Sequence, residues 1–200
     1  MKKLLTLIIS VCVIFTLIGL LPVHGEAEIY DSVIRLHVVA NSDTDEDQQL
    51  KLAVRDKVIE LSKQLEIGVE SIDTAKELLA ENLESIADVA SEEISRLGFD
   101  YPVEVRLSEE EYPTKTYASL CFPSGKYLSL QVLIGDAVGE NWWCVLFPPL
   151  CLDAAQKKQE NEDAFISVGL TTEQYKIITE TENPTYQARF KILELLQGAK

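Results

Sequence analysis

The sequence predicts an α+β fold, in which amphipathic helices pack on one face of a mostly antiparallel sheet. Two observations predict this class. Apolar residues recur at every second position in several short segments, as in strands with one buried face. They recur every three or four positions in two longer segments between residues 42 and 97, as in helices. After an N-terminal signal or anchor segment, residues 28–200 are expected to form a single domain.

The first residues predict export. Two lysines precede an uncharged run of 18 residues, Leu4 to Leu21, and small residues follow it. This order is typical of a secretory signal peptide, but the run is also long enough to cross a bilayer. Residues 1–27 are therefore expected to be either a signal peptide or an uncleaved membrane anchor, and both place the rest of the chain outside the cytoplasm.

The charge balance excludes one class of partner. The chain has 33 acidic and 18 basic residues, a net charge of −15. Removal of residues 1–25 takes away two lysines and no acidic residue, so the exported part carries −17. Nucleic-acid binding needs a basic surface that displaces counterions, so no nucleic-acid partner is expected.

The N-terminal half predicts one strand and two helices. Residues 32–40 (SVIRLHVVA) form a strand pattern, with apolar side chains on one face and Arg35 and His37 on the other. The next residues, NSDTDEDQ, supply helix-capping side chains and acids suited to a first turn. A helix is expected from there to Leu65, and a second amphipathic helix over residues 71–97.

The pattern then changes from helical to alternating. Residues 102–107 predict a short strand. Residues 114–122 and 126–134 flank Pro123-Ser124-Gly125, a compact turn, so these two segments are expected to pair as a hairpin.

The remaining residues predict one more strand and a final helix. Residues 142–147 are a short apolar segment that Pro148 ends. Residues 153–163 are polar and are expected to form a flexible loop, whereas residues 164–182 do not predict a definite element. Asn183-Pro184 is typical of a helix start, and amphipathic residues follow.

The exported chain contains three cysteines, Cys121, Cys144 and Cys151. Exported cysteines tend to be oxidised, and an odd number leaves one thiol over. Pro148-Pro149 favours a reversal of the chain, so we predict a Cys144–Cys151 disulfide, which would stabilise the fold by roughly 2.5 kcal/mol. Two buried thiols, or a bond from Cys121 to either partner, are the alternatives.

A cysteine hydrolase is a further alternative. It would use Cys144 or Cys151 as the nucleophile, His37 as the base and Asn41 or Asn141 to orient the base. No local protease motif surrounds either cysteine, and a disulfide removes the nucleophile. We therefore expect no catalytic residues in this chain.

No motif for a metal, a cofactor or a small-molecule substrate is present. The acids from Asp43 to Asp47 resemble the start of a calcium loop. They are followed by Gln48 and Val54 where such a loop needs glycine and glutamate. Helix capping explains these acids better.

Two patches are candidates for partner binding. Trp142 and Trp143 follow Asn141, and on a strand their side chains point to opposite faces, so we expect one inside and one at the surface or under the loop at 153–163. An exposed tryptophan on a rigid edge is typical of an interface anchor, although the loop covering both is the alternative. Asn41 and Asp43 form the second patch, for which helix capping is the simpler interpretation.

Three stretches resemble the stage II sporulation protein R family of endospore-forming bacteria. They are IRLHVVANSDTDEDQQLKLAVRD (34–56), FPSGKYLSLQVLIG (122–135) and NWWCVLFPPLC (141–151), with a weaker match at ARFKILELL (188–196). Cys121 lies outside these motifs, which supports its being the thiol left over.

The resemblance implies a signalling protein that is made in the forespore and secreted into the space between the forespore and mother-cell membranes. There the family triggers a membrane-embedded aspartic protease of the mother cell, which removes the pro-sequence of the early mother-cell sigma factor. Direct contact with that protease is an inference from the resemblance. A structural envelope protein is the remaining alternative.

Overall fold

The computed structural model describes residues 10–11, 13, 29–65, 68–69, 71–117, 120–149, 151, 165–166 and 172–180. Nearly all of the signal or anchor segment, the polar loop at 153–163 and the final helix after Asn183 lie outside the described residues. Within these ranges, no helix combines the length and the apolar character that a membrane span requires.

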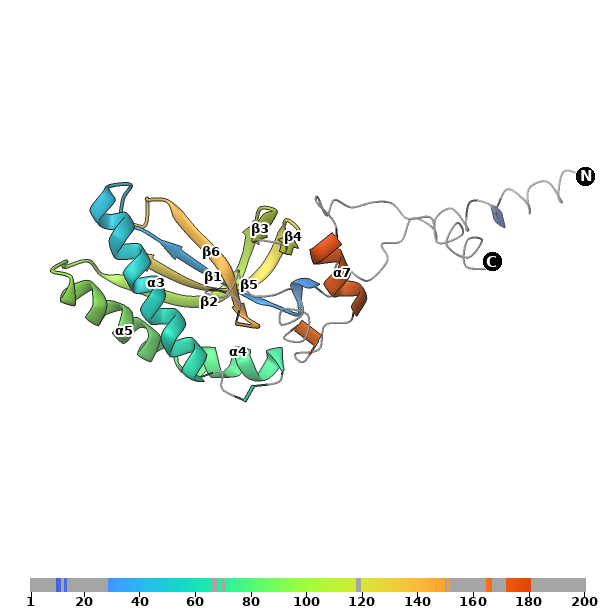
Figure 1. The fold of residues 1–200 in the computed structure, drawn as a ribbon, viewed down its shortest axis with the longest axis horizontal. Coiled ribbons are helices and arrows are strands. Elements are labelled where there is room, and N and C mark those ends of the chain that lie inside the picture. The colour runs from blue at the N-terminus through green and yellow to red at the C-terminus, as the bar shows by residue number, and fades with distance from the viewer. Residues whose placement is uncertain are drawn as a thin grey trace, which may run out of the picture.

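Four strands form the main sheet, in the order β2-β5-β1-β6 (Figure 1). The strands are β1 (Ile34–Val39), β2 (Val103–Tyr112), β5 (Gly125–Ile134) and β6 (Asn141–Phe147). β1 runs parallel to β5 and antiparallel to β6, and β2 runs antiparallel to β5. The predicted α+β class with a mostly antiparallel sheet is confirmed.

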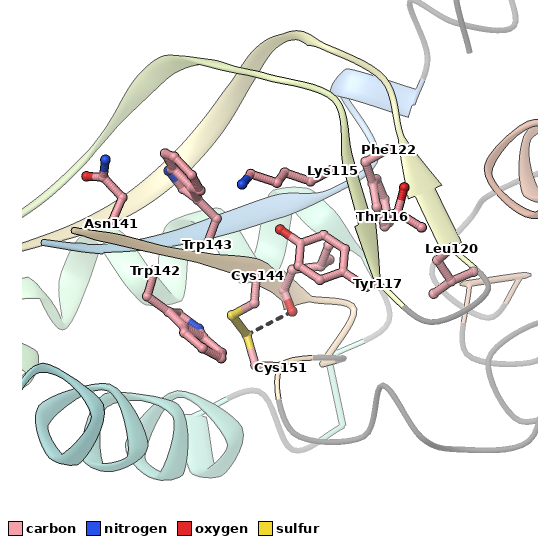
Figure 2. A pocket seen from close by; sticks show the side chains of 11 residues that line it. Lys115, Thr116, Tyr117, Leu120, Phe122, Asn141, Trp142, Trp143, Cys144 and Cys151 are labelled. Carbon is pink, nitrogen blue, oxygen red and sulfur yellow. Dashed lines mark hydrogen bonds between the residues drawn. A yellow bond between two sulfur atoms is a disulfide. The ribbon is translucent and has the colours of Figure 1, made fainter. Parts of the chain in front are cut away.

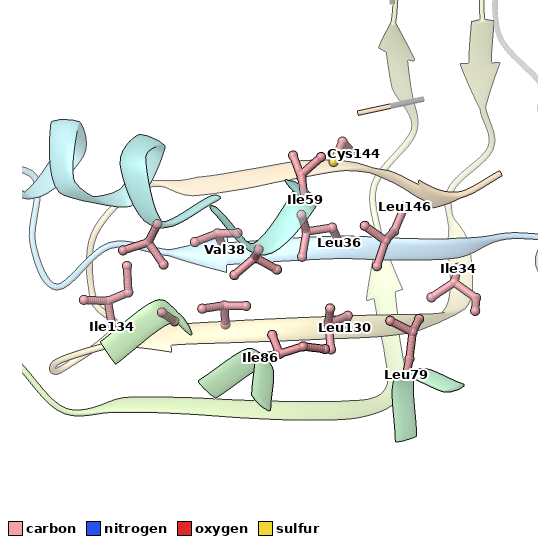
Figure 3. Packing of buried hydrophobic residues seen from close by; sticks show 14 of the residues in the cluster. Ile34, Leu36, Val38, Ile59, Leu79, Ile86, Leu130, Ile134, Cys144 and Leu146 are labelled. Carbon is pink, nitrogen blue, oxygen red and sulfur yellow. The ribbon is translucent and has the colours of Figure 1, made fainter. Parts of the chain in front are cut away.

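Helices α3 (Asp45–Leu65), α4 (Ile72–Glu81) and α5 (Leu83–Arg96) pack on one face of this sheet (Figures 1 and 3). Their apolar stripes meet alternate strand side chains in one cluster. The buried members are Ile34, Leu36, Val38, Leu50, Val54, Val58, Ile59, Ala75, Leu79, Ile86, Ala90, Ile94, Leu130, Val132, Ile134, Cys144, Leu146 and Phe147. Burial of each large aliphatic side chain stabilises the fold by about 1.5–3 kcal/mol. The helices thus anchor β1 and β5 at the centre of the sheet.

The prediction of a single helix over residues 71–97 is wrong in one respect, because the helix is broken at Asn82. The backbone there has φ −109° and ψ 13°, outside the helical range. The side-chain amide of Asn82 donates to the carbonyl of Leu78 at 2.8 Å, so the side chain competes with the helical backbone. The apolar stripe continues on both sides of the break, and for this reason the sequence pattern did not reveal it.

The predicted hairpin is also wrong. β5 pairs with β2, in a register that runs from Val103↔Ile134 to Tyr112↔Gly125. β2 therefore continues past the predicted end at residue 107, through acidic residues that the apolar pattern does not mark as a strand. The segment at 114–122 instead folds on itself, because β3 (Lys115–Tyr117) pairs with β4 (Leu120–Phe122).

A second apolar cluster covers the other face of the sheet. It contains Ile29, Val33, Tyr112, Leu120, Phe122, Tyr127, Val145, Phe165, Tyr175 and Ile178. The last of these lies in α7 (Thr172–Glu180), a helix in the segment for which the sequence predicted no definite element. With both faces covered, every residue of β1 is buried.

Candidate functional site

β6 carries most of the residues predicted to bind a partner, and it is one of the two edge strands of the described sheet. The indoles of Trp142 and Trp143 point to opposite faces of it, as predicted (Figure 2). Trp142 lies toward α3, with the guanidinium of Arg55 4.2 Å from its ring, and Trp143 lies near Lys115 Nζ, also at 4.2 Å. Each tryptophan is half-buried, so neither ring is fully inside the fold or fully exposed, and the loop at 153–163 expected to cover one of them lies outside the described residues.

The predicted Cys144–Cys151 disulfide is confirmed, with an S–S distance of 2.11 Å and a Cα–Cα distance of 5.3 Å. The chain turns at Pro148-Pro149 between the two cysteines. Sγ of Cys151 lies 3.0 Å from the carbonyl oxygen of Val145. This is a packing contact, because a disulfide sulfur has no proton to donate. The thiol of Cys121 is buried elsewhere, on β4.

A cavity of about 410 Å³ lies beside β6, and we call it the β6 groove (Figure 2). Its lining comes from β6, from the β3–β4 hairpin and from the disulfide. The lining residues are Lys115, Thr116, Tyr117, Leu120, Phe122, Asn141, Trp142, Trp143, Cys144, Val145 and Cys151. Sequence reasoning found the β6 side of this groove but missed the hairpin wall, because that wall depends on how residues 115–122 fold back.

Arg35 lies fully buried behind the hairpin wall. Its Nε donates to the carbonyl oxygen of Cys144 at 3.1 Å, and its Nη2 donates to the hydroxyl oxygen of Tyr117 at 2.8 Å. Four aromatic rings surround the guanidinium at 4.4–5.6 Å: Tyr112, Tyr117, Phe122 and Tyr127. Burial raises the pKa of Tyr117, although the positive charge of Arg35 opposes this. The tyrosine therefore stays a neutral hydroxyl at neutral pH.

The arrangement required for a cysteine hydrolase is not assembled. In the register of β1 with β6, Leu36 pairs with Cys144 and His37 with Trp143, so His37 and Cys144 lie on opposite faces of the sheet. His37 Nδ1 lies 2.9 Å from a carboxylate oxygen of Glu110, and Nε2 lies 2.8 Å from the side-chain oxygen of Asn141. The sulfur of Cys144 is in the disulfide. This alternative is therefore wrong for these residues.

Asn41 and Asp43 anchor the connection between β5 and β6. The side-chain oxygen of Asn41 accepts from the backbone N–H of Asp136 at 3.0 Å, and Asp43 accepts from that of Glu140 at 2.7 Å. A side chain at Gly139 would collide with the backbone carbonyl of Ser42, so this close approach requires glycine. Both predicted patches thus meet at the start of β6.

The described residues contain no group of three or more histidine, cysteine, aspartate or glutamate side chains placed to hold a metal ion.

Comparison with known proteins shows which family the chain is related to. The family model described as stage II sporulation protein R matches residues 30–157. The chain belongs to the stage II sporulation protein R family. The protein named stage II sporulation protein R from Bacillus subtilis (strain 168) is 38% identical over 139 residues, which cover 67% of this chain and 62% of that relative. No solved structure matches the chain.

Membership implies a role in sporulation. The residues matched by the family model run from before β1 to beyond Cys151, so they include the whole main sheet, the disulfide and every residue that lines the β6 groove. The segment of Phe165 and α7 lies beyond the matched residues.

Proposed function

We propose that this chain is a secreted sporulation signal that triggers a membrane-embedded aspartic protease of the mother cell. That protease then removes the pro-sequence of the early mother-cell sigma factor. Family membership over residues 30–157 is the single observation that carries this proposal. The chain acts in the space between the forespore and mother-cell membranes and contacts the protease directly.

The chemistry of the chain supports this placement. A Cys144–Cys151 disulfide is typical of proteins outside the cytoplasm. The strongly acidic composition favours a soluble molecule that does not adhere to anionic membranes or nucleic acid.

The proposed contact residues are Asn141, Trp142 and Trp143 on β6, with Asn41 and Asp43 beside the start of that strand. A ligand activates a protease when it binds the active state better than the inactive one. Docking of this edge would therefore favour the active, dimerised protease.

Reconstitution in a non-sporulating bacterial host tests the proposal. The full chain, the protease and the sigma-factor precursor are expressed together, and precursor cleavage is followed by immunoblotting. Cleavage is expected only when the exported chain is present. The matched control is a chain without residues 1–27, which stays in the cytoplasm and should be inactive. Cleavage that is independent of the chain would overturn the proposal.

The envelope-protein alternative gives a different result in a spore-forming host. Deletion of the gene should leave processing of the precursor unchanged if the chain is only structural. If the chain is the signal, the precursor should accumulate.

A further inference from the structure

The β6 groove lies between two strand edges. Among the described strands, β6 pairs only with β1, and β3 pairs only with β4. Residues 115–117 of β3 and 141–145 of β6 line the groove without interruption. An unbroken run of lining residues is the mark of a strand edge, because a face would contribute only alternate residues.

The direction of the β6 backbone groups follows from one hydrogen bond. The carbonyl oxygen of Ala40, directly after β1, accepts from the backbone N–H of Gly139, so it points toward β6. By alternation Leu36 also points toward β6, and the backbone groups of its partner Cys144 point back toward β1. Backbone groups alternate in direction along a strand, so those of Asn141, Trp143 and Val145 point outward. The contact between the Val145 oxygen and Sγ of Cys151, which lies outside the sheet, agrees with this assignment. The edge thus presents backbone groups to the groove.

Apolar side chains flank these backbone groups. Trp143 and Val145 line the groove on one side, and Tyr117, Leu120 and Phe122 line it on the other. A sheet edge with apolar flanks is a template for an added strand, in which main-chain hydrogen bonds give affinity and pockets select the side chains.

One cation, Lys115, lines the groove, and a second, Arg35, is buried behind its hairpin wall. No described carboxylate forms an ion pair with either. Lys115 Nζ lies over the ring of Trp143. Arg35 is fully buried behind Tyr117, and its Nη1 has no hydrogen-bond partner among the described residues. A buried guanidinium without an anion is unfavourable, and the chain as a whole is acidic, with a net charge of −15. The groove is therefore a local positive site suited to an anionic group.

We propose that the β6 groove binds an extended, acidic segment of the partner protein as an additional strand along β6. Backbone hydrogen bonds to Asn141 and Trp143, upstream of the Val145 oxygen that Cys151 covers, hold the segment in place. Apolar side chains of the segment pack between Trp143 and Tyr117, and one carboxylate pairs with Lys115 in the positive field of Arg35. The inference rests on the proposed function, because it assumes a protein partner, and it adds the mode of recognition.

Photo-crosslinking tests which molecule occupies the groove. Thr116 is exposed and lines the groove, so a Thr116→p-benzoylphenylalanine variant of the full chain is co-expressed with the protease and the precursor. The matched control places the same residue at Glu77, which is exposed on α4. We expect a light-dependent adduct with the protease from position 116 only, which mass spectrometry maps to an acidic segment outside the membrane.

The outcomes separate this inference from the function it rests on. If the adduct forms with a second copy of this chain, with its own residues 152–164 or with a non-acidic segment, the inference is overturned. Cleavage of the precursor without any adduct from position 116 also overturns it and leaves the proposed function standing. Failure of the unmodified chain to cause cleavage overturns the proposed function itself.

Charge reversal tests the ion pair. We expect Lys115→Glu to raise the concentration of secreted chain needed for half-maximal cleavage about tenfold, and Lys115→Arg to leave it nearly unchanged. Lys76→Glu makes the same charge change on the exposed surface of α4 and serves as the control. Equal effects of Lys115→Glu and Lys76→Glu would show that the groove does not recognise an acid.

A pair of substitutions at Trp143 tests strand addition. Trp143→Ala and Trp143→Pro both remove the indole, but only proline also removes the outward backbone N–H. An edge strand tolerates proline at such a position, because the N–H there does not pair within the sheet. We expect the concentration of secreted chain needed for half-maximal cleavage to be about five to ten times higher for the proline variant than for the alanine variant. Equal potency of the two variants, with unchanged thermal unfolding, would rule out an added strand at this edge.

Discussion

Arg35 and His37 are buried polar residues on the same face of β1, and different groups surround each of them. Four aromatic rings and two oxygen acceptors surround Arg35. His37 instead lies between a carboxylate and an amide. A buried polar group that loses its partners costs free energy, so both residues are expected to be structural.

We expect Arg35→Ala to lower the free energy of unfolding by about 3 kcal/mol, because it leaves a cavity among the rings and removes the cation–π contacts. Lys76→Ala is the control, since Lys76 is exposed on α4 and its removal should cost less than about 1 kcal/mol. Denaturant unfolding measures both variants. Similar losses in the two would contradict the role given to Arg35.

We expect His37→Gln to lower the free energy of unfolding by about 1–2 kcal/mol, because glutamine replaces the hydrogen bonds to Glu110 and Asn141 only in part. Precursor cleavage in the reconstituted host should be retained. Loss of cleavage in a variant that still folds and binds the protease would instead restore a catalytic role for the histidine.

At the scale of elements, the start of α3 and the end of β6 are each held by local chemistry. Ser42, Thr44 and Asn41 satisfy polar groups in the first turn of α3. The disulfide joins the end region of β6 to the turn that follows it. The disulfide lines the β6 groove, and Asp43, just before α3, holds the residue that precedes β6 by accepting from the backbone N–H of Glu140.

We expect Cys151→Ser to lower the free energy of unfolding by about 2–3 kcal/mol under oxidising conditions, because the closed loop restricts the unfolded chain. The free energies of unfolding of the variant and the parent are then measured again with a reducing agent, which also removes the disulfide from the parent. The difference between the two proteins should then largely disappear. A difference that persists after reduction would mean that the residue acts through packing.

Asp47 makes the stability depend on pH. Burial opposes its ionisation, but hydrogen bonds from Ser42, Asn41, Tyr101 and Thr44 together lower its pKa below the ordinary value of 3.8. The folded state therefore binds fewer protons than the unfolded state. The stabilisation is complete above about pH 4 and is lost as the pH falls through the folded-state value.

We expect Asp47→Asn to be less stable than the parent at neutral pH and to lose less stability between neutral pH and about pH 3. Urea unfolding at the two pH values measures this. Part of the loss in acid should remain, because Arg96 also lowers the pKa of Glu93. Parallel curves for the variant and the parent would contradict the assignment.

At the scale of the whole molecule, both faces of the sheet are covered and its β6 edge lines the groove. Helices cover one face, and the aromatic cluster with α7 covers the other. Phe165 completes this second cluster although it lies beyond the residues that match the family model. Its ring centroid lies 6.2 Å from that of Phe122 and 5.8 Å from that of Tyr175.

We expect Phe165→Ala to lower the free energy of unfolding by about 3–4 kcal/mol, since the ring is fully buried. The neighbouring Ile166 is 43% exposed, so Ile166→Ala should cost less than about 1 kcal/mol. Thermal or denaturant unfolding compares the two. An equal effect would mean that the segment does not pack on the sheet in solution.

The sequence alone predicted the fold class, the strand of β1 with its two faces, the opposite directions of the two tryptophans and the Cys144–Cys151 bond. These features follow from local rules, because side-chain period determines which residues share a face and a proline turn brings nearby cysteines together. The family resemblance came from the same residues and is shown by the comparisons.

Only the tertiary structure decided that β5 pairs with β2, that the helix breaks at Asn82 and that aromatic rings surround Arg35. It also decided that the β3–β4 hairpin faces the edge of β6 and forms the groove. Strand pairing and cavity walls join segments far apart in the chain. No local period records which distant segment a strand will meet, so these features depend on the packing of the whole molecule.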